Sequence, residues 1–144
     1  MLAVGCDHGG YQLKLELMDF LQKKGIEFKD FGCEGEAVDY PDIAEKVCRE
    51  IIEKRADNAL LICGTGIGIS IAANKIKGIR AAVCADYFSA KYTRKHNDAN
   101  VICFGGRTIG PELAKELLDV FLSTEFDGGK HAVRVEKLMK LEEK

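Results

Sequence analysis

The sequence predicts an α/β protein, a three-layer α/β/α sandwich of Rossmann-like type with a five-stranded parallel sheet and an extra C-terminal helix. Three observations lead to this prediction. Short apolar segments alternate with amphipathic helical segments along the chain, which is the pattern of repeated βαβ units. The apolar run 59–62 shows no polar alternation, as expected for a strand covered by helices on both faces. A glycine-rich turn follows that run and leads directly into a helical segment.

The five strands are expected where short apolar runs end in polar or glycine residues. We place them at residues 2–6, 26–31, 59–62, 79–85 and 101–104. Helices are expected where apolar residues recur at helical spacing. These segments cover residues 13–24, 43–52, the stretch from the glycine turn to about 77, 86–96, 111–121 and 130 to about 142.

Local signals define several helix ends. Gly25 closes the first helix, Asp86 is a plausible N-cap, and Pro111 can occupy the first position of the fifth helix. The last helix follows a break at Gly128-Gly129 and is additional to the alternating units. It either packs on its own domain or reaches a partner subunit, and the pattern leaves both arrangements open.

Length and composition favour one globular domain over residues 1–144. The apolar fraction is 47%, the charged fraction 31% and the formal net charge −2, which argues against nucleic acid or an anionic membrane as a general partner. No apolar run reaches transmembrane length, and the first residues lack the features of a signal peptide. The six cysteines include no C-x-x-C pair, so we expect free thiols, no metal site and a reduced, cytoplasmic location.

The residues suited to chemistry lie where the predicted strands end. Ligands of open parallel sheets bind beyond the carboxyl ends of the strands, at the switch point in strand order. Here those ends carry Asp7-His8, the run 63–65, Asp86 and the run 105–107. If the helices after the first and third strands leave to opposite faces, a crevice opens between those two turns.

The central turn combines an anion cradle with a thiol. Gly64, Gly66 and Gly68 carry no Cβ, so backbone N–H groups can face an anion at a helix N-terminus. Cys63 stands at the mouth of this turn, where the helix dipole favours the thiolate. These parts suit proton transfer beside a carbonyl through an enediolate on a small phosphorylated substrate. His96 can act as acid or base, and a phosphate can be held by His8, Arg107, Lys130, His131 and Arg134.

Six motifs together resemble ribose-5-phosphate isomerase type B, whose wider family also contains galactose-6-phosphate and allose-6-phosphate isomerases. The resemblance extends from about Ala3 to Leu138. The central motif and the His-Asn-Asp motif are highly specific in combination. The motifs are GCDHGG (5–10), DYP (39–41), ICGTGIGISIAANK (62–75), GIRA (78–81), HND (96–98) and FDGGKH (126–131).

The resemblance implies roles for individual residues. Cys63 would be the base that moves a proton between C1 and C2, and His96 would assist opening of the furanose ring. Gly64, Thr65, Gly66, Ile67 and Gly68 would hold the enediolate. Substrate would also be bound by Asp7, His8, Asn97, Arg107, Lys130 and Arg134, the last three across a subunit interface. The resemblance implies a homodimer or a tetramer and requires no metal and no organic cofactor.

One departure and three alternatives accompany this interpretation. Lys130 stands where the family pattern leads us to expect Arg, and a point charge would hold a phosphate in looser geometry than a planar fork. A six-carbon sugar phosphate is the alternative substrate. A nucleotide-binding module is disfavoured, because Ile69 stands where the dinucleotide fingerprint needs its third glycine. A non-catalytic member of the family is the remaining alternative.

Overall fold

Five parallel strands form one sheet in the computed structural model, which describes residues 1–144. The sheet has the order β2-β1-β3-β5-β4, so β3 lies at its centre. Leu60 on β3 is in register with Val4 on β1 and with Ile102 on β5. The strands are β1 (Leu2–Cys6), β2 (Phe28–Asp30), β3 (Asn58–Cys63), β4 (Ala81–Val83) and β5 (Val101–Gly105). The predicted fold class is confirmed.

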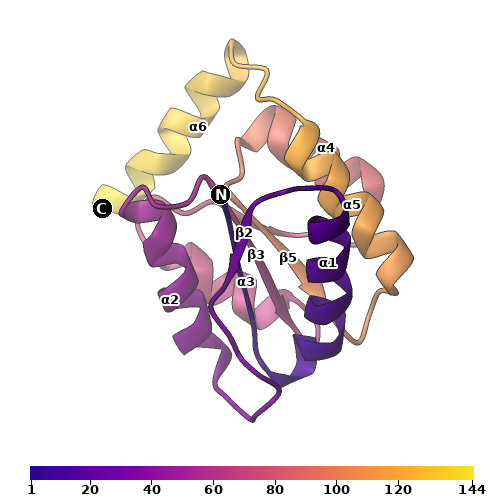
Figure 1. Ribbon diagram of the computed structural model, residues 1–144. Helices are drawn as coiled ribbons and strands as arrows, with labels where there is room; N and C mark the ends of the chain where they lie inside the picture. Colours follow the sequence, from indigo (N-terminus) through magenta and orange to yellow (C-terminus); the bar gives the residue numbers. More distant parts are fainter.

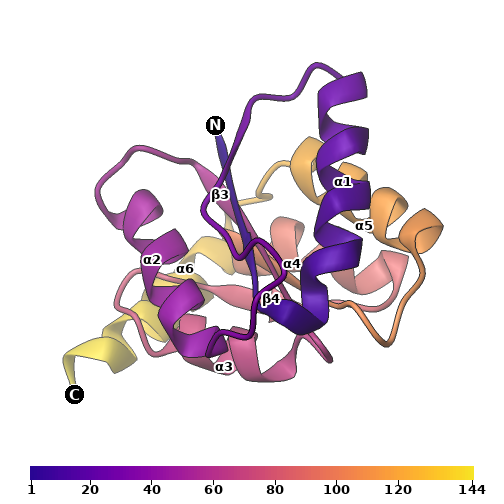
Figure 2. The same cartoon turned by 60° about the horizontal axis from the view of Figure 1, so that its bottom comes forward.

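Helices cover both faces of the sheet (Figures 1 and 2). On one face lie α1 (Tyr11–Lys23), α4 (Tyr87–Asn97) and α5 (Pro111–Ser123). On the other face lie α2 (Tyr40–Ile52) and α3 (Ile67–Asn74). The helix after β1 and the helix after β3 therefore leave to opposite faces, which places the switch point between the turns that follow these two strands.

Two apolar layers hold the helices to the sheet. Successive strand residues point to opposite faces, so Ile62 packs toward α1 and α5, whereas Leu61 and Cys63 pack toward α2 and α3. The side chains of Leu17 and Leu117 are fully buried in the first layer. A buried leucine of this kind stabilises the fold by about 1.5–3 kcal/mol.

Several elements are shorter than the sequence predicts. The second strand covers Phe28–Asp30 instead of 26–31, and the fourth covers Ala81–Val83 instead of 79–85. Both are edge strands, each with a ladder partner on one side only. The helix α3 ends at Asn74 instead of about 77, because the Asn74 side chain binds the backbone of Ala81 through its amide nitrogen (2.9 Å) and its amide oxygen (2.8 Å).

The additional C-terminal helix, α6 (Lys130–Lys140), is present and lies outside the three layers (Figure 1). None of its residues is buried, and the apolar side chains of Val133 and Leu138 are 54% and 46% exposed. The short helix η2 (Leu141–Glu143) follows it, and the Glu142 carboxylate accepts the Gly78 N–H at 3.0 Å. The chain has no helix with the length and apolar character needed to span a membrane.

One charged residue of α1 is fully buried against expectation. The ammonium group of Lys14 donates to both carboxylate oxygens of Asp30, at 2.8 and 3.1 Å, and to the carbonyl of Cys33. A buried cation is tolerated only when its donors find partners of this kind. Lys14 therefore anchors the segment after β2 to α1.

Replacing Lys14 with Met is expected to lower the free energy of unfolding by about 3 kcal/mol, because Asp30 and the Cys33 carbonyl lose their buried donor. Lys24→Met is the matched control, since Lys24 forms an exposed ion pair with Asp119 worth less than about 1 kcal/mol. Chemical denaturation of the two variants measures both values. Equal destabilisation by the two substitutions would contradict the role given to Lys14.

Candidate active site

The turn between β3 and α3 forms a cup of backbone N–H groups beside a sulfur atom. The Cys63 Sγ accepts the N–H of Gly66 at 3.1 Å, and the Cys63 side chain is only 4% exposed. Gly66 has φ +78°, a left-handed conformation that lets the chain turn from the strand into the helix. The amides of Gly64, Thr65 and Gly68 have no hydrogen-bond partner within the chain. The turn can therefore bind a negatively charged oxygen.

Three glycine-containing turns pack main chain against main chain at the carboxyl ends of β1, β3 and β5. A Cβ on Gly9 would lie 2.9 Å from the Gly64 nitrogen, and a Cβ on Gly106 would lie 2.5 Å from the Gly9 carbonyl oxygen. The Gly106 N–H also donates to the Cys63 carbonyl at 2.8 Å. Arg107 follows, and its Nη1 lies 3.2 Å from the point where a Gly64 Cβ would be. The predicted crevice is thus lined by backbone and by one exposed guanidinium.

Two further predicted residues follow β1 at the same edge. Asp7 is 8% exposed, and its Oδ1 accepts the Gly9 N–H at 2.9 Å, so it caps the short helix η1 (His8–Gly10). His8 is exposed, and its Nδ1 accepts the Val38 N–H at 3.4 Å. Tyr40, which sequence reasoning left out of the site, packs against the turn, since a Cβ on Gly68 would lie 2.7 Å from its ring. Its place beside Pro41 in the DYP motif was the only signal for it.

The other predicted site residues lie at the opposite end of the sheet, near the amino ends of the strands. The helix α4 runs back from β4 and ends with His96 and Asn97, four residues before β5 begins at Val101. His96 stacks on His131 at the start of α6, with ring centroids 3.9 Å apart and planes 7° apart. Lys130 and Arg134 flank this pair on α6, and neither forms an ion pair.

The electrostatics of the histidine pair favour a neutral His131. Loss of solvent around its ring and electrostatic repulsion from His96, Lys130 and Arg134 lower the pKa of His131 below its ordinary value of 6.5, with Asp127 acting in the opposite sense. Asp127 also brings its carboxylate within 4.8 Å of both imidazoles. The nitrogen lone pairs of the two stacked imidazoles lie in nearly parallel planes, so these three groups, as they stand, do not converge on one metal ion.

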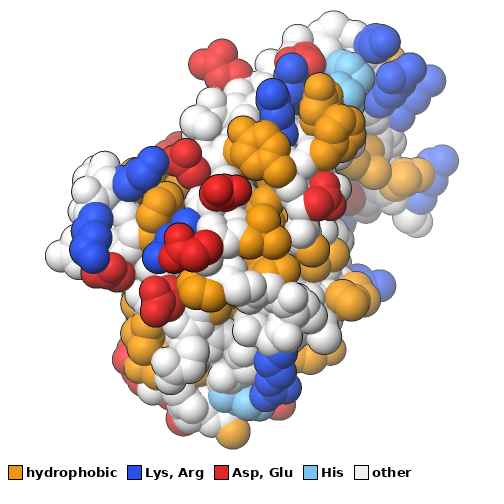
Figure 3. Space-filling view, turned by 90° about the vertical axis from the view of Figure 1, so that its right-hand side faces the viewer, with side chains coloured by type: hydrophobic (Ala, Val, Ile, Leu, Met, Phe, Trp, Pro, Cys, Tyr) orange, Lys and Arg blue, Asp and Glu red, His pale blue; other side chains and the backbone are white.

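Each chain therefore carries two separate groups of predicted site residues. The first group lies at the carboxyl ends of the strands, is called the carboxyl-edge group, and contains Asp7, His8, Arg107 and the run 63–68. The amino-edge group contains His96, Asn97, Lys130, His131 and Arg134. Strand β5 separates them by roughly 13 Å at 3.3 Å per residue. Figure 3 likewise shows histidines near opposite ends of one face, each beside Lys or Arg side chains. The expectation that His8 and Arg107 share a phosphate with Lys130 and Arg134 is not met within one chain.

The cavities of the chain follow the same division. A hollow of about 380 Å³ is lined by His96, Asn97 and Arg134 together with Val135 and Leu138. A larger one of about 620 Å³ adjoins it, with Asn97 and Leu138 in common. Neither of these two hollows includes Cys63.

All six cysteines are free and buried, as expected, but their surroundings differ. Burial raises the pKa of Cys6 and of Cys48 to about 12 and that of Cys84 to about 11. Burial also raises the pKa of Cys103 well above its ordinary value. These four thiols stay protonated at neutral pH. The Cys63 Sγ accepts a main-chain N–H at the start of a helix.

Comparison with known proteins gives the family to which this chain belongs. The chain matches the model of the family described as Ribose/Galactose Isomerase over residues 2–138. A solved structure of ribose-5-phosphate isomerase B from Clostridium thermocellum is 50% identical, with a TM-score of 0.96 over 99% of this chain and 97% of that one. Ribose-5-phosphate isomerase B of Escherichia coli is 46% identical, and the match covers 99% of this chain and 97% of that protein.

A further relative is D-erythrulose-4-phosphate isomerase of Pectobacterium atrosepticum, which is 45% identical over 95% of this chain and 91% of that protein. These matches span nearly the whole length of every protein compared. The chain belongs to the ribose/galactose isomerase family and is an aldose–ketose isomerase.

Gly66→Ala is expected to lower the free energy of unfolding by about 2–4 kcal/mol. The alanine would have to adopt a left-handed backbone conformation, and its Cβ would lie 2.7 Å from the Phe104 carbonyl carbon. Gly110→Ala is the control, since Gly110 has φ −81° and no atom within 4 Å of an added Cβ. Thermal and chemical denaturation compare the two variants. A Gly66→Ala protein as stable as the control would contradict the described turn.

Proposed function

We propose that this isomerase interconverts ribose 5-phosphate and ribulose 5-phosphate, with Cys63 as the base. The observation that supports the proposal best is the arrangement of the β3–α3 turn. A sulfur that accepts a helix N-terminal N–H stands beside three amides without partners. This is the combination that proton transfer through an enediolate requires: a base, and donors for the oxygen that becomes negative.

The proposed reaction moves one hydrogen between two carbons of the open-chain sugar. The Cys63 thiolate takes the proton from C2, the C2–H bond breaks, and the electron pair flows toward the C1 carbonyl oxygen. The amides of Gly64, Thr65 and Gly68 bind the resulting enediolate. Cys63, whose thiol proton exchanges with solvent while the enediolate is bound, then gives a proton to C1, while a proton moves from O2 to O1. His96 assists ring opening beforehand, and Asn97 and Asp7 bind sugar oxygens.

We infer that a working site needs two copies of the chain. Cys63 and His96 lie at opposite edges of the sheet, so one molecule of sugar phosphate cannot contact both in a single chain. In a twofold dimer, the carboxyl-edge group of one copy can face the amino-edge group of the other. The helix α6 supports this arrangement, because it carries Lys130 and Arg134 and keeps its apolar side chains exposed.

The number of carbon atoms in the sugar is the part of the proposal that the names of the relatives support least. Relatives of nearly equal identity are named for a five-carbon and for a four-carbon sugar phosphate. A panel of four-, five- and six-carbon aldose phosphates in D₂O tests both parts of the proposal. We expect the highest kcat/KM with ribose 5-phosphate and deuterium at C1 of the ketose. Preference for a six-carbon substrate, or hydrogen transfer without deuterium uptake, would overturn the corresponding part.

Cys63→Ala is expected to lower kcat by at least about 100-fold, since a positioned general base contributes a factor of this order or more. Cys48→Ala is the matched control, because Cys48 is a buried thiol of the same apolar layer with its pKa raised to about 12. Initial rates and unfolding curves of both variants are measured. A Cys63→Ala enzyme with most of the wild-type turnover would remove Cys63 from the role of base.

Mixing two inactive variants tests the shared site directly. Cys63→Ala and His96→Ala homodimers each lack one essential group in both sites, whereas a mixed dimer retains one intact site. Coexpression in equal amounts should restore about a quarter of the wild-type activity, because half the dimers are mixed and each has one complete site. The separately purified variants provide the baseline. Absence of recovery in a mixed dimer verified by mass would contradict the two-copy site.

A further inference from the structure

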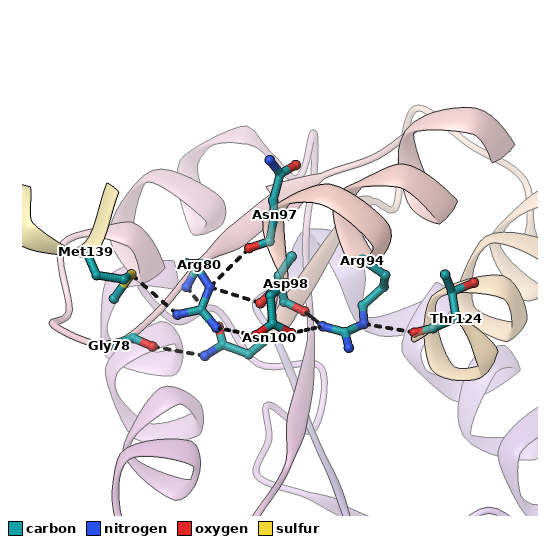
Figure 4. Close-up of polar contacts among 9 residues, drawn as sticks. Gly78, Arg80, Arg94, Asn97, Asp98, Asn100, Thr124 and Met139 are labelled. Carbon is teal, nitrogen blue, oxygen red and sulfur yellow. Dashed lines mark hydrogen bonds and ion pairs between the residues drawn. The ribbon is translucent and has the colours of Figure 1, made fainter. Parts of the chain in front are cut away.

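The C-terminal end of α4 is fixed by contacts of Asp98, the first residue after the helix. Asp98 follows Asn97 with φ +46° and ψ +43°, a left-handed conformation that is uncommon outside glycine and that Asp adopts more readily than most residues. Two guanidinium groups bind its carboxylate (Figure 4). The Arg94 Nη1 donates to Asp98 Oδ1 at 2.9 Å, and the Arg80 Nη2 donates to Asp98 Oδ2 at 3.4 Å.

Arg80 also holds the last carbonyl groups of the helix. Its Nε donates to the Asp98 carbonyl at 2.9 Å and to the Asn97 carbonyl at 3.2 Å. The positive charge lies at the negative end of the α4 dipole, where it is stabilising. Figure 4 shows the Asn97 side chain pointing away from this network, so Arg80 fixes the backbone and leaves the amide free. The side chains of Arg80 and Arg94 are only 17% and 15% exposed.

The same guanidinium reaches the helix that carries the candidate phosphate ligands. The Arg80 Nη1 donates to the Met139 Sδ at 3.4 Å, and Met139 lies on α6 with Lys130 and Arg134. Arg80 is itself anchored, because its backbone N–H donates to Asn100 Oδ1 at 2.8 Å. Asn100 in turn donates its side-chain N–H to the Gly78 carbonyl at 2.9 Å. One side chain therefore joins the end of α4 to α6 and ties both to the segment before β4.

We propose that Arg80 is a positioning residue of the isomerase, one that sets the end of α4, and with it His96 and Asn97, relative to α6. Arg80 acts through these residues and does not itself contact substrate in this proposal. The catalytic part of the inference rests on the proposed function. The positioning part concerns the folded chain alone and is testable without any reaction.

Arg80→Lys tests the positioning by NMR, since lysine keeps the charge but loses the fork that binds carbonyl, carboxylate and sulfur together. The chain has three histidines, and their ring signals report on both edges of the sheet. We expect the His96 and His131 signals to shift and the His8 signal to stay in place. Arg49→Lys is the matched control, because Arg49 forms an exposed pair with Glu45 on α2. Unchanged His96 and His131 signals in Arg80→Lys would overturn the proposal.

The kinetic arm compares ribose 5-phosphate with the open-chain substrate erythrose 4-phosphate. Misplacement of His96 should lower kcat/KM for the cyclic substrate by about 10- to 100-fold and should lower it less for the open-chain one. Equal losses on both substrates would count against Arg80 acting through His96. A wild-type enzyme inactive on every sugar phosphate would defeat the proposed function but leave the NMR result valid.

Asp98→Asn is the second variant, in case Arg80→Lys fails to fold. Asparagine tolerates the left-handed conformation, but it removes the negative charge and one of the two acceptor oxygens that bind Arg94 and Arg80. We expect the same two histidine signals to shift by a smaller amount. A spectrum identical to that of the wild type would again contradict the proposal.

Discussion

The close approach of three backbone turns at the carboxyl edge of the sheet is the constraint on which the rest of the site depends. Gly9, Gly64 and Gly106 lie so near to one another that a Cβ on Gly9 or on Gly106 would meet main-chain atoms of a neighbouring turn. Main chain packed in this way is held in place by its neighbours, and amides of the β3–α3 turn next to Cys63 have no partner within the chain. Donors fixed before substrate arrives need no reorganisation during the reaction, which is why preorganised amides stabilise a developing oxyanion effectively.

The candidate residues near the amino ends of the strands are held in place in a different way. Its functional candidates are long side chains on the ends of two helices, and they are placed by other side chains rather than by backbone contact. Arg80, Arg94 and Asp98 fix the end of α4, and His131 stacks on His96. The helix α6 contributes cations without burying any of its own residues. The candidates at one end of the sheet are therefore placed by backbone contact, and those at the other end by side-chain contact.

Much of the fold could be predicted because its signals are local. The apolar run before Gly64, the glycine spacing of the turn and Pro111 at the start of α5 each act within a few residues of themselves. The shortened α3 could not be predicted, because the Asn74 side chain ends it by binding Ala81 across a gap in sequence. The buried Lys14 was missed for the same reason, since its partners Asp30 and Cys33 belong to another segment. At the site, the order of strands and helices already places His96 and Asn97 at the far end of a helix, just before β5, away from the turns that follow β1 and β3. It could not predict that His96 stacks on His131, because that contact joins two helices far apart in the sequence.

The two shortest strands have a consequence for how copies of this chain meet. Both β2 and β4 are outermost, and each contains only three residues. An outer strand of this length offers few open N–H and C=O groups to a strand from another molecule, so the sheet has little tendency to continue into a neighbour. The two short outer strands in this way protect the sheet against edge-to-edge pairing and fibrous growth.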